Sequence, residues 1–107
     1  MKAVFADTSF FLASLNPDDQ LHERAISVSR EVTAPRLTTG FVLLEVANAM
    51  SRAALRSRFV EFYAWLCQHP RVRIVPVSEV LFHRGYALYA ARENKDSSLT
   101  DCIGFRG

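Results

Sequence analysis

Short apolar segments that alternate with longer helical ones constrain the fold of this chain more than any other feature. Residues 2–6, 34–38 and 72–77 are strand-like, and a segment with helical character follows each of them. Capping residues and prolines place the expected helices at residues 9–15, 17–30, 39–54, 58–67, 80–93 and from 99 onward. Strands separated by helices form parallel sheets covered by helices, so the pattern predicts an α/β fold with a central parallel sheet.

The composition fits one small domain over residues 1–107, in which 50% of the residues are apolar and 22% are charged. A net charge of +2 permits nucleic acid as a partner without demanding it. Cys67 and Cys102 form neither a C-x-x-C pair nor a disulfide framework, which predicts a reducing, cytoplasmic setting. We find no signal peptide and no membrane span, so we expect no membrane partner.

Asp7 follows the first predicted strand directly. Ligands of parallel sheets bind beyond the carboxyl ends of the strands, so this carboxylate occupies a position typical of a functional site. It is equally suited to cap the helix that follows, because Asp is a preferred N-cap residue. Both interpretations remain open for Asp7 from the sequence alone.

The predicted helix at 39–54 is apolar on most of its circumference, with one narrow polar stripe. Glu45, Asn48 and Arg52 lie at i, i+3 and i+7 and form this stripe. It is either a solvated edge, where Arg52 helps to neutralise Glu45, or the wall of a cleft. A carboxylate on a helix packed on several sides needs a partner or a cation.

Asp101 is the third candidate acid, and Ser98-x-x-Asp101 also resembles a capping box. Three carboxylates that converge repel one another unless a hard cation lies between them, and Mg²⁺ or Mn²⁺ fits oxygen ligands. The histidines His22, His69 and His83 are scattered and lack the spacing of a zinc site.

Three segments together resemble the successive motifs of the PIN-domain family: ADTSFFLA, TTGFVLLEVANAM and KDSSLTDCIGF. The resemblance implies a three-layer α/β/α fold and a metal-dependent ribonuclease, as in the toxins of toxin–antitoxin pairs. It also implies that Asp7, Glu45 and Asp101 are the catalytic acids and hold Mg²⁺ or Mn²⁺. In the family, the DTS segment that contains Ser9 supports the acidic cluster, and Asp96 is a further acid nearby. Arg52, Arg56 and Arg58 follow the predicted helix that carries Glu45, and they either contact the RNA backbone or form a solvated helix end.

The family pattern continues with a further strand and a fourth acid, whereas this sequence ends at Gly107. We therefore expect an incomplete PIN-like domain that lacks the C-terminal strand or strands. The first strand would then be an exposed apolar edge, which predicts a homo-oligomer or a partner such as an antitoxin. The alternative is a non-catalytic remnant that binds RNA or protein. A phosphatase-like or receiver-like domain built on Asp7 leaves the other two motifs unexplained.

Overall fold

The computed structural model describes residues 2–91 and 98–106, and for Asp101, Phe105 and Arg106 it describes the main chain only. Its strands are β1 (Val4–Phe5), β2 (Arg36–Thr39) and β3 (Val72–Val75), and they form a parallel sheet in the order β1-β2-β3. Val4 pairs with Arg36, and Arg36 pairs with Val72. The predicted parallel sheet is confirmed.

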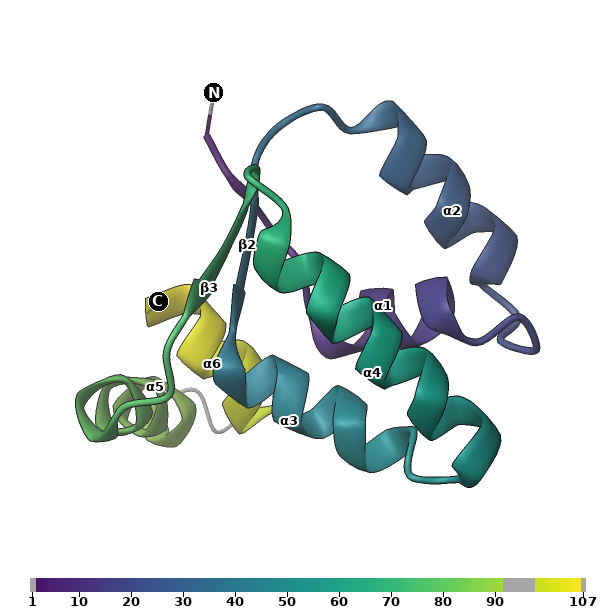
Figure 1. Ribbon diagram of the computed structural model, residues 1–107. Helices are drawn as coiled ribbons and strands as arrows, with labels where there is room; N and C mark the ends of the chain where they lie inside the picture. The colour runs from purple at the N-terminus through teal and green to yellow at the C-terminus, as the bar shows by residue number, and fades with distance from the viewer. Residues whose placement is uncertain (1, 92–97, 107) are drawn as a thin grey trace.

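Helices cover both faces of this sheet (Figure 1). They are α1 (Thr8–Leu15), α2 (His22–Glu31), α3 (Gly40–Ala49), α4 (Ala53–Gln68), α5 (Glu79–Ala91) and α6 (Leu99–Arg106). Figure 1 shows α1, α2 and α4 on one side of the strands and α5 and α6 on the other, which confirms the three-layer α/β/α architecture. In the described ranges, no helix has the length and apolar character needed to cross a membrane.

The core is built around α3. Val42 and Val46 are completely inaccessible to solvent, and Met50 at the end of the helix is almost as deeply buried. They pack with Phe11 of α1 and Leu66 of α4 in one cluster. This packing explains why the α3 sequence is apolar on most of its circumference, since neighbours surround the helix on several sides.

The chain leaves α3 earlier than the sequence predicts. The helix expected over residues 39–54 ends at Ala49, and α4 begins at Ala53. The Ser51 hydroxyl donates to the Asn48 carbonyl at 2.5 Å and so satisfies the main chain at the helix end. Arg52 is therefore the residue that precedes α4, in an extended conformation, and the prediction that it continues the α3 stripe is wrong.

The second helix also begins later than predicted. Residues 17–21 form turns, and α2 begins at His22. The side-chain oxygen of Asn16 accepts from the Asp18 main chain at 3.1 Å, and that of Asp19 accepts from Leu21 at 2.8 Å. These local hydrogen bonds compete with the helix and displace its start by about one turn.

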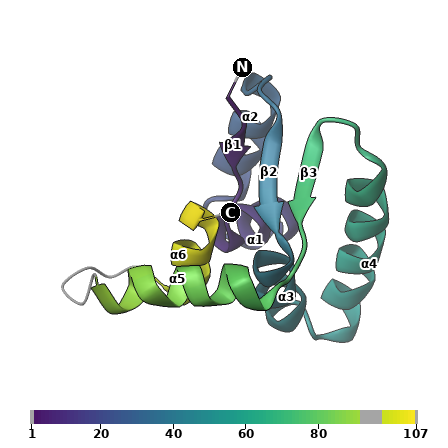
Figure 2. The same ribbon diagram turned by 90° about the vertical axis from the view of Figure 1, so that its left-hand side faces the viewer.

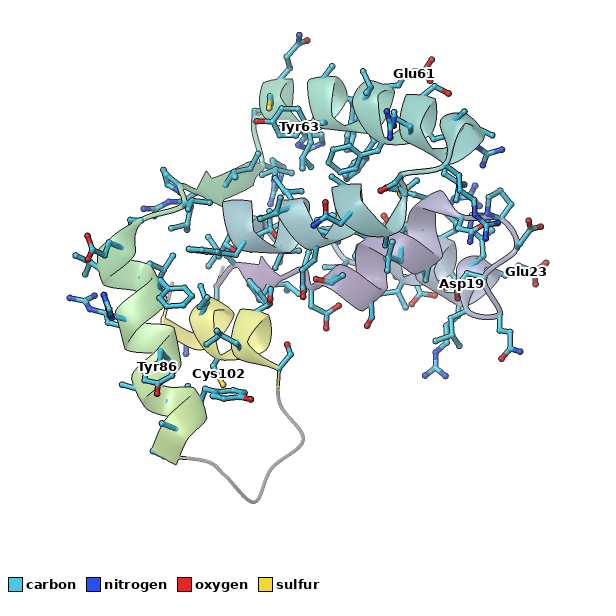
Figure 3. All side chains as sticks on the ribbon, turned by 90° about the horizontal axis from the view of Figure 1, so that it is seen from below. Asp19, Glu23, Glu61, Tyr63, Tyr86 and Cys102 are labelled. Atoms are coloured by element: carbon cyan, nitrogen blue, oxygen red, sulfur yellow. The ribbon has the colours of Figure 1, made fainter. Side chains whose placement is uncertain are left out.

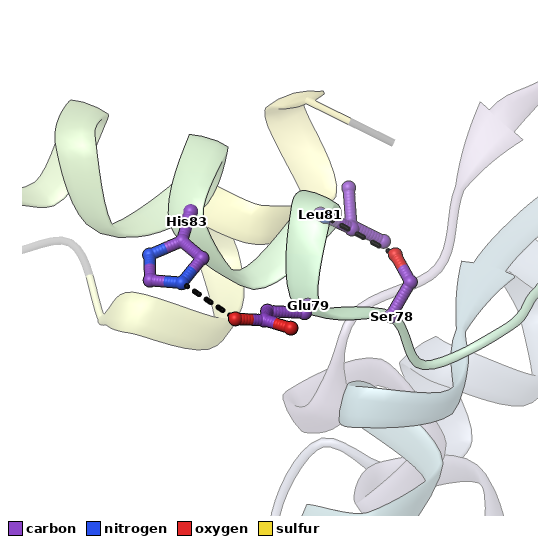
Figure 4. Close-up of polar contacts among 4 residues, drawn as sticks. All are labelled: Ser78, Glu79, Leu81 and His83. Carbon is purple, nitrogen blue, oxygen red and sulfur yellow. Dashed lines mark hydrogen bonds and ion pairs between the residues drawn. The ribbon is translucent and has the colours of Figure 1, made fainter.

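Helix α5 is capped at its N-terminus by Ser78, whose hydroxyl accepts from the Leu81 main chain at 3.1 Å (Figure 4). Glu79, the first residue of α5, and His83 one turn later form an exposed pair at 3.5 Å. A narrow buried stripe that includes Leu81 and Gly85 holds α5 against α6, where Cys102 is buried (Figure 3). The last two residues of the helix predicted over 80–93 lie outside the described residues.

Strand β1 lies at one edge of the described sheet, as predicted. Its main-chain N–H groups at Val4 and Ala6 donate to β2-side carbonyls, both at 2.8 Å. In a parallel strand, the main-chain N–H and C=O groups of successive residues point to opposite sides of the strand. Since Val4 and Ala6 point to β2, the groups of Ala3 and Phe5 point to the open side. Val4 keeps 42% of its surface exposed, so this edge is apolar as well as unpaired within the described sheet.

Candidate active site

The carboxyl edge of the sheet gathers the N-termini of three helices (the lower end of the strands in Figure 2). Asp7 caps α1 after β1, Thr39 caps α3 after β2, and Ser78 caps α5 after β3. The unpaired N–H groups and the dipole of a helix N-terminus favour negative charge nearby. The edge is therefore electrostatically suited to carboxylates and to phosphate groups.

Asp7 is half-buried at this edge. Its Oδ1 accepts a hydrogen bond from the Phe10 main chain at 2.9 Å, so the capping interpretation is correct. The cap uses one carboxylate oxygen, and no hydrogen bond to Oδ2 is found among the described residues. Capping therefore fixes the carboxylate without consuming its capacity to bind a cation.

Glu45 reaches this part of the molecule from the middle of α3. The hydroxyl of Thr8, the residue next to Asp7, donates to Glu45 Oε1 at 2.8 Å. Glu45 is exposed and forms no ion pair with Arg52 in the described structure, so the solvated stripe neutralised by Arg52 is not observed. The structure thus connects the segment that carries Asp7 with the side chain of Glu45.

Asp101 lies in α6, and its side chain is outside the described residues, as is all of Asp96. The main chain of α6 packs against α5 and α3, and Gly104 lies against the ring of Phe5 in β1. Helix α6 therefore stands beside α3, which carries Glu45, and beside β1, which ends two residues before Asp7. Among the described side chains, which leave out that of Asp101, no three His, Cys, Asp or Glu groups gather. The three-acid cluster remains a prediction.

The donor set at this edge is made of oxygen atoms. Asp7 and Glu45 offer carboxylates, and no described His or Cys side chain joins them in a group of three. Hard divalent cations such as Mg²⁺ and Mn²⁺ prefer carboxylate oxygen, whereas Zn²⁺ prefers nitrogen and sulfur. The two described acids fit the predicted cation in chemistry.

The fold and the carboxyl-edge acids agree with the comparison with protein families, in which residues 4–103 match the PIN domain. The chain belongs to the PIN-domain family. A comparison with curated proteins gives no match.

This PIN domain is similar in structure to Mycobacterium tuberculosis VapC20, which is described as a sarcin-ricin loop cleaving toxin. The two share 22% sequence identity, and the TM-score is 0.84. The match covers 96% of this chain and 78% of VapC20. At this identity the likeness establishes the fold.

The arginines with predicted RNA contacts lie around the connection between α3 and α4. Arg52 precedes α4, and Arg56 Nε donates to the Ser51 carbonyl at 3.2 Å. Arg58 reaches the carbonyl of Leu15 at 3.4 Å, where α1 ends. The guanidinium groups of Arg56 and Arg58 therefore brace main-chain carbonyls near the ends of helices.

Thr8 is a residue that the sequence patterns did not indicate. The predicted supporting hydroxyl is that of Ser9, which is exposed, whereas the hydroxyl of Thr8 donates to Glu45. The only local signal for Thr8 is its place as the first residue of α1, directly after the capping residue. Its partner lies 37 positions away, which no local pattern reveals.

A cavity of about 550 Å³ lies elsewhere in this PIN domain, against β2 and between α1, α2 and α4. Aromatic side chains line it, among them Phe10, Phe62 and Trp65, and Arg36 and Arg71 add positive charge. Neither Asp7 nor Glu45 lines this cavity. The candidate active site at the carboxyl edge of the sheet is therefore separate from this cavity.

Proposed function

We propose that this chain is a divalent-metal-dependent endoribonuclease in which Asp7, Glu45 and Asp101 bind Mg²⁺ or Mn²⁺. The observation that carries the proposal is the 2.8 Å hydrogen bond from Thr8 to Glu45, in a chain of the PIN family. This bond holds the carboxylate of Glu45 beside Thr8, which is the residue that follows Asp7. We infer that residues 1–107 act as one nuclease domain.

The bound cation would supply a water of lowered pKa and would neutralise charge on the reacting phosphate. Asp7 offers the cation the oxygen that its cap leaves unused. Glu45 binds the cation or orients the attacking water. The N-termini of α1 and α3 add partial positive charge that favours the phosphate. Ser9 and Asp96 support the cluster in this proposal, and Arg52 and Arg56 contact the RNA backbone.

The proposed biological role is the toxin of a toxin–antitoxin pair. The structural likeness to VapC20, a sarcin-ricin loop cleaving toxin, supports this role. An antitoxin protein is then the expected partner. The open edge at β1 supports a homo-oligomer, because unpaired strand edges pair with other chains. Cys67 and Cys102 are both free, which supports the reducing environment of the cytoplasm.

The direct test incubates the protein with labelled single-stranded RNA and with a sarcin-ricin loop RNA, each with Mn²⁺. The comparison uses Asp7→Asn, because Asn caps a helix as well as Asp does but lacks the negative charge. We expect the variant to keep its melting temperature and to cleave at least about 100-fold more slowly than the wild-type protein. Equal cleavage by both proteins would show that a contaminant cuts the RNA.

Titration calorimetry with Mn²⁺ separates this proposal from a non-catalytic remnant. The nuclease binds Mn²⁺ in the folded wild-type protein, and both Asp7→Asn and Glu45→Gln weaken that binding. A folded protein that binds no Mn²⁺ and still retains RNA would support the remnant instead.

A further inference from the structure

Glu45 is held in place by one hydrogen bond among the described residues. Its carboxylate stands at the end of a flexible side chain on the exposed side of α3, with no ion pair in the described structure. The Thr8 hydroxyl donates to Oε1 at 2.8 Å, across 37 positions of the sequence. Without this bond the long side chain would sample several rotamers, and ordering it would cost free energy when a ligand binds.

The hydroxyl of Thr8 is free for this task because of its place in α1. A hydroxyl inside a helix usually donates to the carbonyl four residues earlier, as Ser14 does to Phe10 at 2.8 Å. Thr8 is the first residue of the helix, so the residue four positions earlier, Val4, belongs to β1 instead. Its hydroxyl therefore turns to a neighbouring helix.

Two features make Thr8 a rigid donor. The side chain is branched at Cβ, which restricts its rotamers in a helix. The helix start beneath it is fixed by the Asp7 cap, through the 2.9 Å bond from the Phe10 main chain. The same few residues thus fix Asp7 and orient Glu45, so the positions of the two carboxylates are coupled.

We infer that Thr8 is a positioning residue, which orients the Glu45 carboxylate toward a divalent cation shared with Asp7. The inference rests on the proposed function. A carboxylate oxygen that accepts one hydrogen bond keeps a further lone pair, and Oε2 is left for the cation. Hydrogen bonds to metal ligands of this kind raise metal affinity by about 10- to 100-fold in other proteins.

The test compares Thr8→Val, which keeps the shape and loses the hydroxyl, with Thr8→Ser, which keeps the hydroxyl. Thr33→Val makes the same chemical change at an exposed site before β2 and serves as the matched control. Calorimetry with Mn²⁺ alone measures the affinity, circular dichroism the melting temperature, and cleavage of labelled RNA the activity. We expect Thr8→Val to bind Mn²⁺ about 10- to 100-fold more weakly, and Thr8→Ser and Thr33→Val to resemble the wild-type protein.

A double-mutant cycle shows whether Thr8 acts through Glu45 and keeps the test decisive if Thr8→Val alone is unstable. In a Glu45→Gln background, Thr8→Val should weaken Mn²⁺ binding no further. The inference is overturned if Thr8→Val binds Mn²⁺ like the wild-type protein, if Thr8→Ser fails to restore binding, or if the effects of the two substitutions simply add. A wild-type protein that neither binds Mn²⁺ nor cleaves RNA overturns the proposed function itself.

Discussion

Gly85 of α5 lies so close to Ile103 of α6 that no side chain fits between the two helices. A Cβ atom on Gly85 would lie 2.8 Å from the Ile103 Cα and 2.9 Å from its main-chain nitrogen. Main-chain atoms of a packed helix cannot turn aside as a side chain does. This contact therefore sets the distance between α5 and α6, and α6 is the helix that carries Asp101.

We predict that Gly85→Ala moves α6 and destabilises the fold by about 1 to 3 kcal/mol, as overpacked cores do. A loss of stability would be informative, because replacing glycine by alanine normally stabilises a helix by about 1 kcal/mol. Urea unfolding measures the stability, and Mn²⁺ calorimetry follows the effect on the proposed site. Gly104→Ala is the matched control with a smaller expected cost, since its neighbours are ring atoms at the far end of the Phe5 side chain rather than main-chain atoms. A Gly85→Ala protein as stable as the wild type would contradict the close packing.

Asp7 has two separable roles, and two substitutions distinguish them. Asp7→Ala removes the cap of α1 and should lower the free energy of unfolding by about 1 kcal/mol. Asp7→Asn keeps a capping oxygen and should leave the stability near that of the wild type, while both variants lose the charge that binds the cation. Thermal unfolding of the two variants and the wild-type protein, without metal, measures their stabilities. Equal destabilisation by Asn and Ala would mean that the charge of Asp7, rather than its capping oxygen, stabilises the helix start.

Thr38 holds the end of β1 in place from inside the sheet. It is fully buried, and its hydroxyl donates to the Ala6 carbonyl, directly before Asp7, at 3.0 Å. Thr38→Val removes this donor from a buried carbonyl and should cost about 1 to 2 kcal/mol in urea unfolding. At Thr33, which is exposed and precedes β2, the same substitution to valine should stay within about 0.5 kcal/mol of the wild type. A Thr38→Val protein more stable than the wild type would show that the hydroxyl of Thr38 is dispensable.

The open edge of β1 predicts an oligomer that a single proline disrupts. The N–H of Ala3 points away from β2, so Ala3→Pro removes an outward donor and leaves the described ladder intact. Light scattering at micromolar concentration should show an oligomer for the wild type and a smaller mass for Ala3→Pro. Val4→Pro is the contrasting variant, because it breaks the 2.8 Å bond from Val4 to the Pro35 carbonyl and should destabilise the fold. A monomeric wild-type protein would rule out pairing through this edge.

Tyr63 and Cys67 lie one turn apart on α4 (Tyr63 is labelled in Figure 3). The side-chain hydrogen bond with Cys67 raises the pKa of Tyr63 above its usual value, and the charge of the Cys67 thiolate adds to this effect. Cys67→Ala removes both causes, so the pKa of Tyr63 should fall and tyrosinate should form at lower pH. Ultraviolet titration measures this change, with Cys102→Ala as the control at a buried cysteine away from Tyr63. An unchanged titration curve for Cys67→Ala would contradict the predicted interaction.

Most of the layer architecture was predictable from the sequence, because it depends on local patterns. Strand-like runs followed by capped helices predict a parallel sheet with helices on both faces, and the sheet is found in that form. The errors lie where short-range hydrogen bonds compete with the helix. Ser51 ends α3 before Arg52, and the Asn16 and Asp19 side chains delay α2 until His22.

The sequence by itself determined which residues cap helices and which acids stand at the ends of strands, because capping and periodicity involve residues only a few positions apart. It did not determine which of these groups meet. The hydrogen bond from Thr8 to Glu45 and the approach of α6 to Phe5 follow from the tertiary structure alone. Such contacts require strands to pair and helices to pack across many tens of residues, and the side chains at the contact carry no local sign of their distant partner.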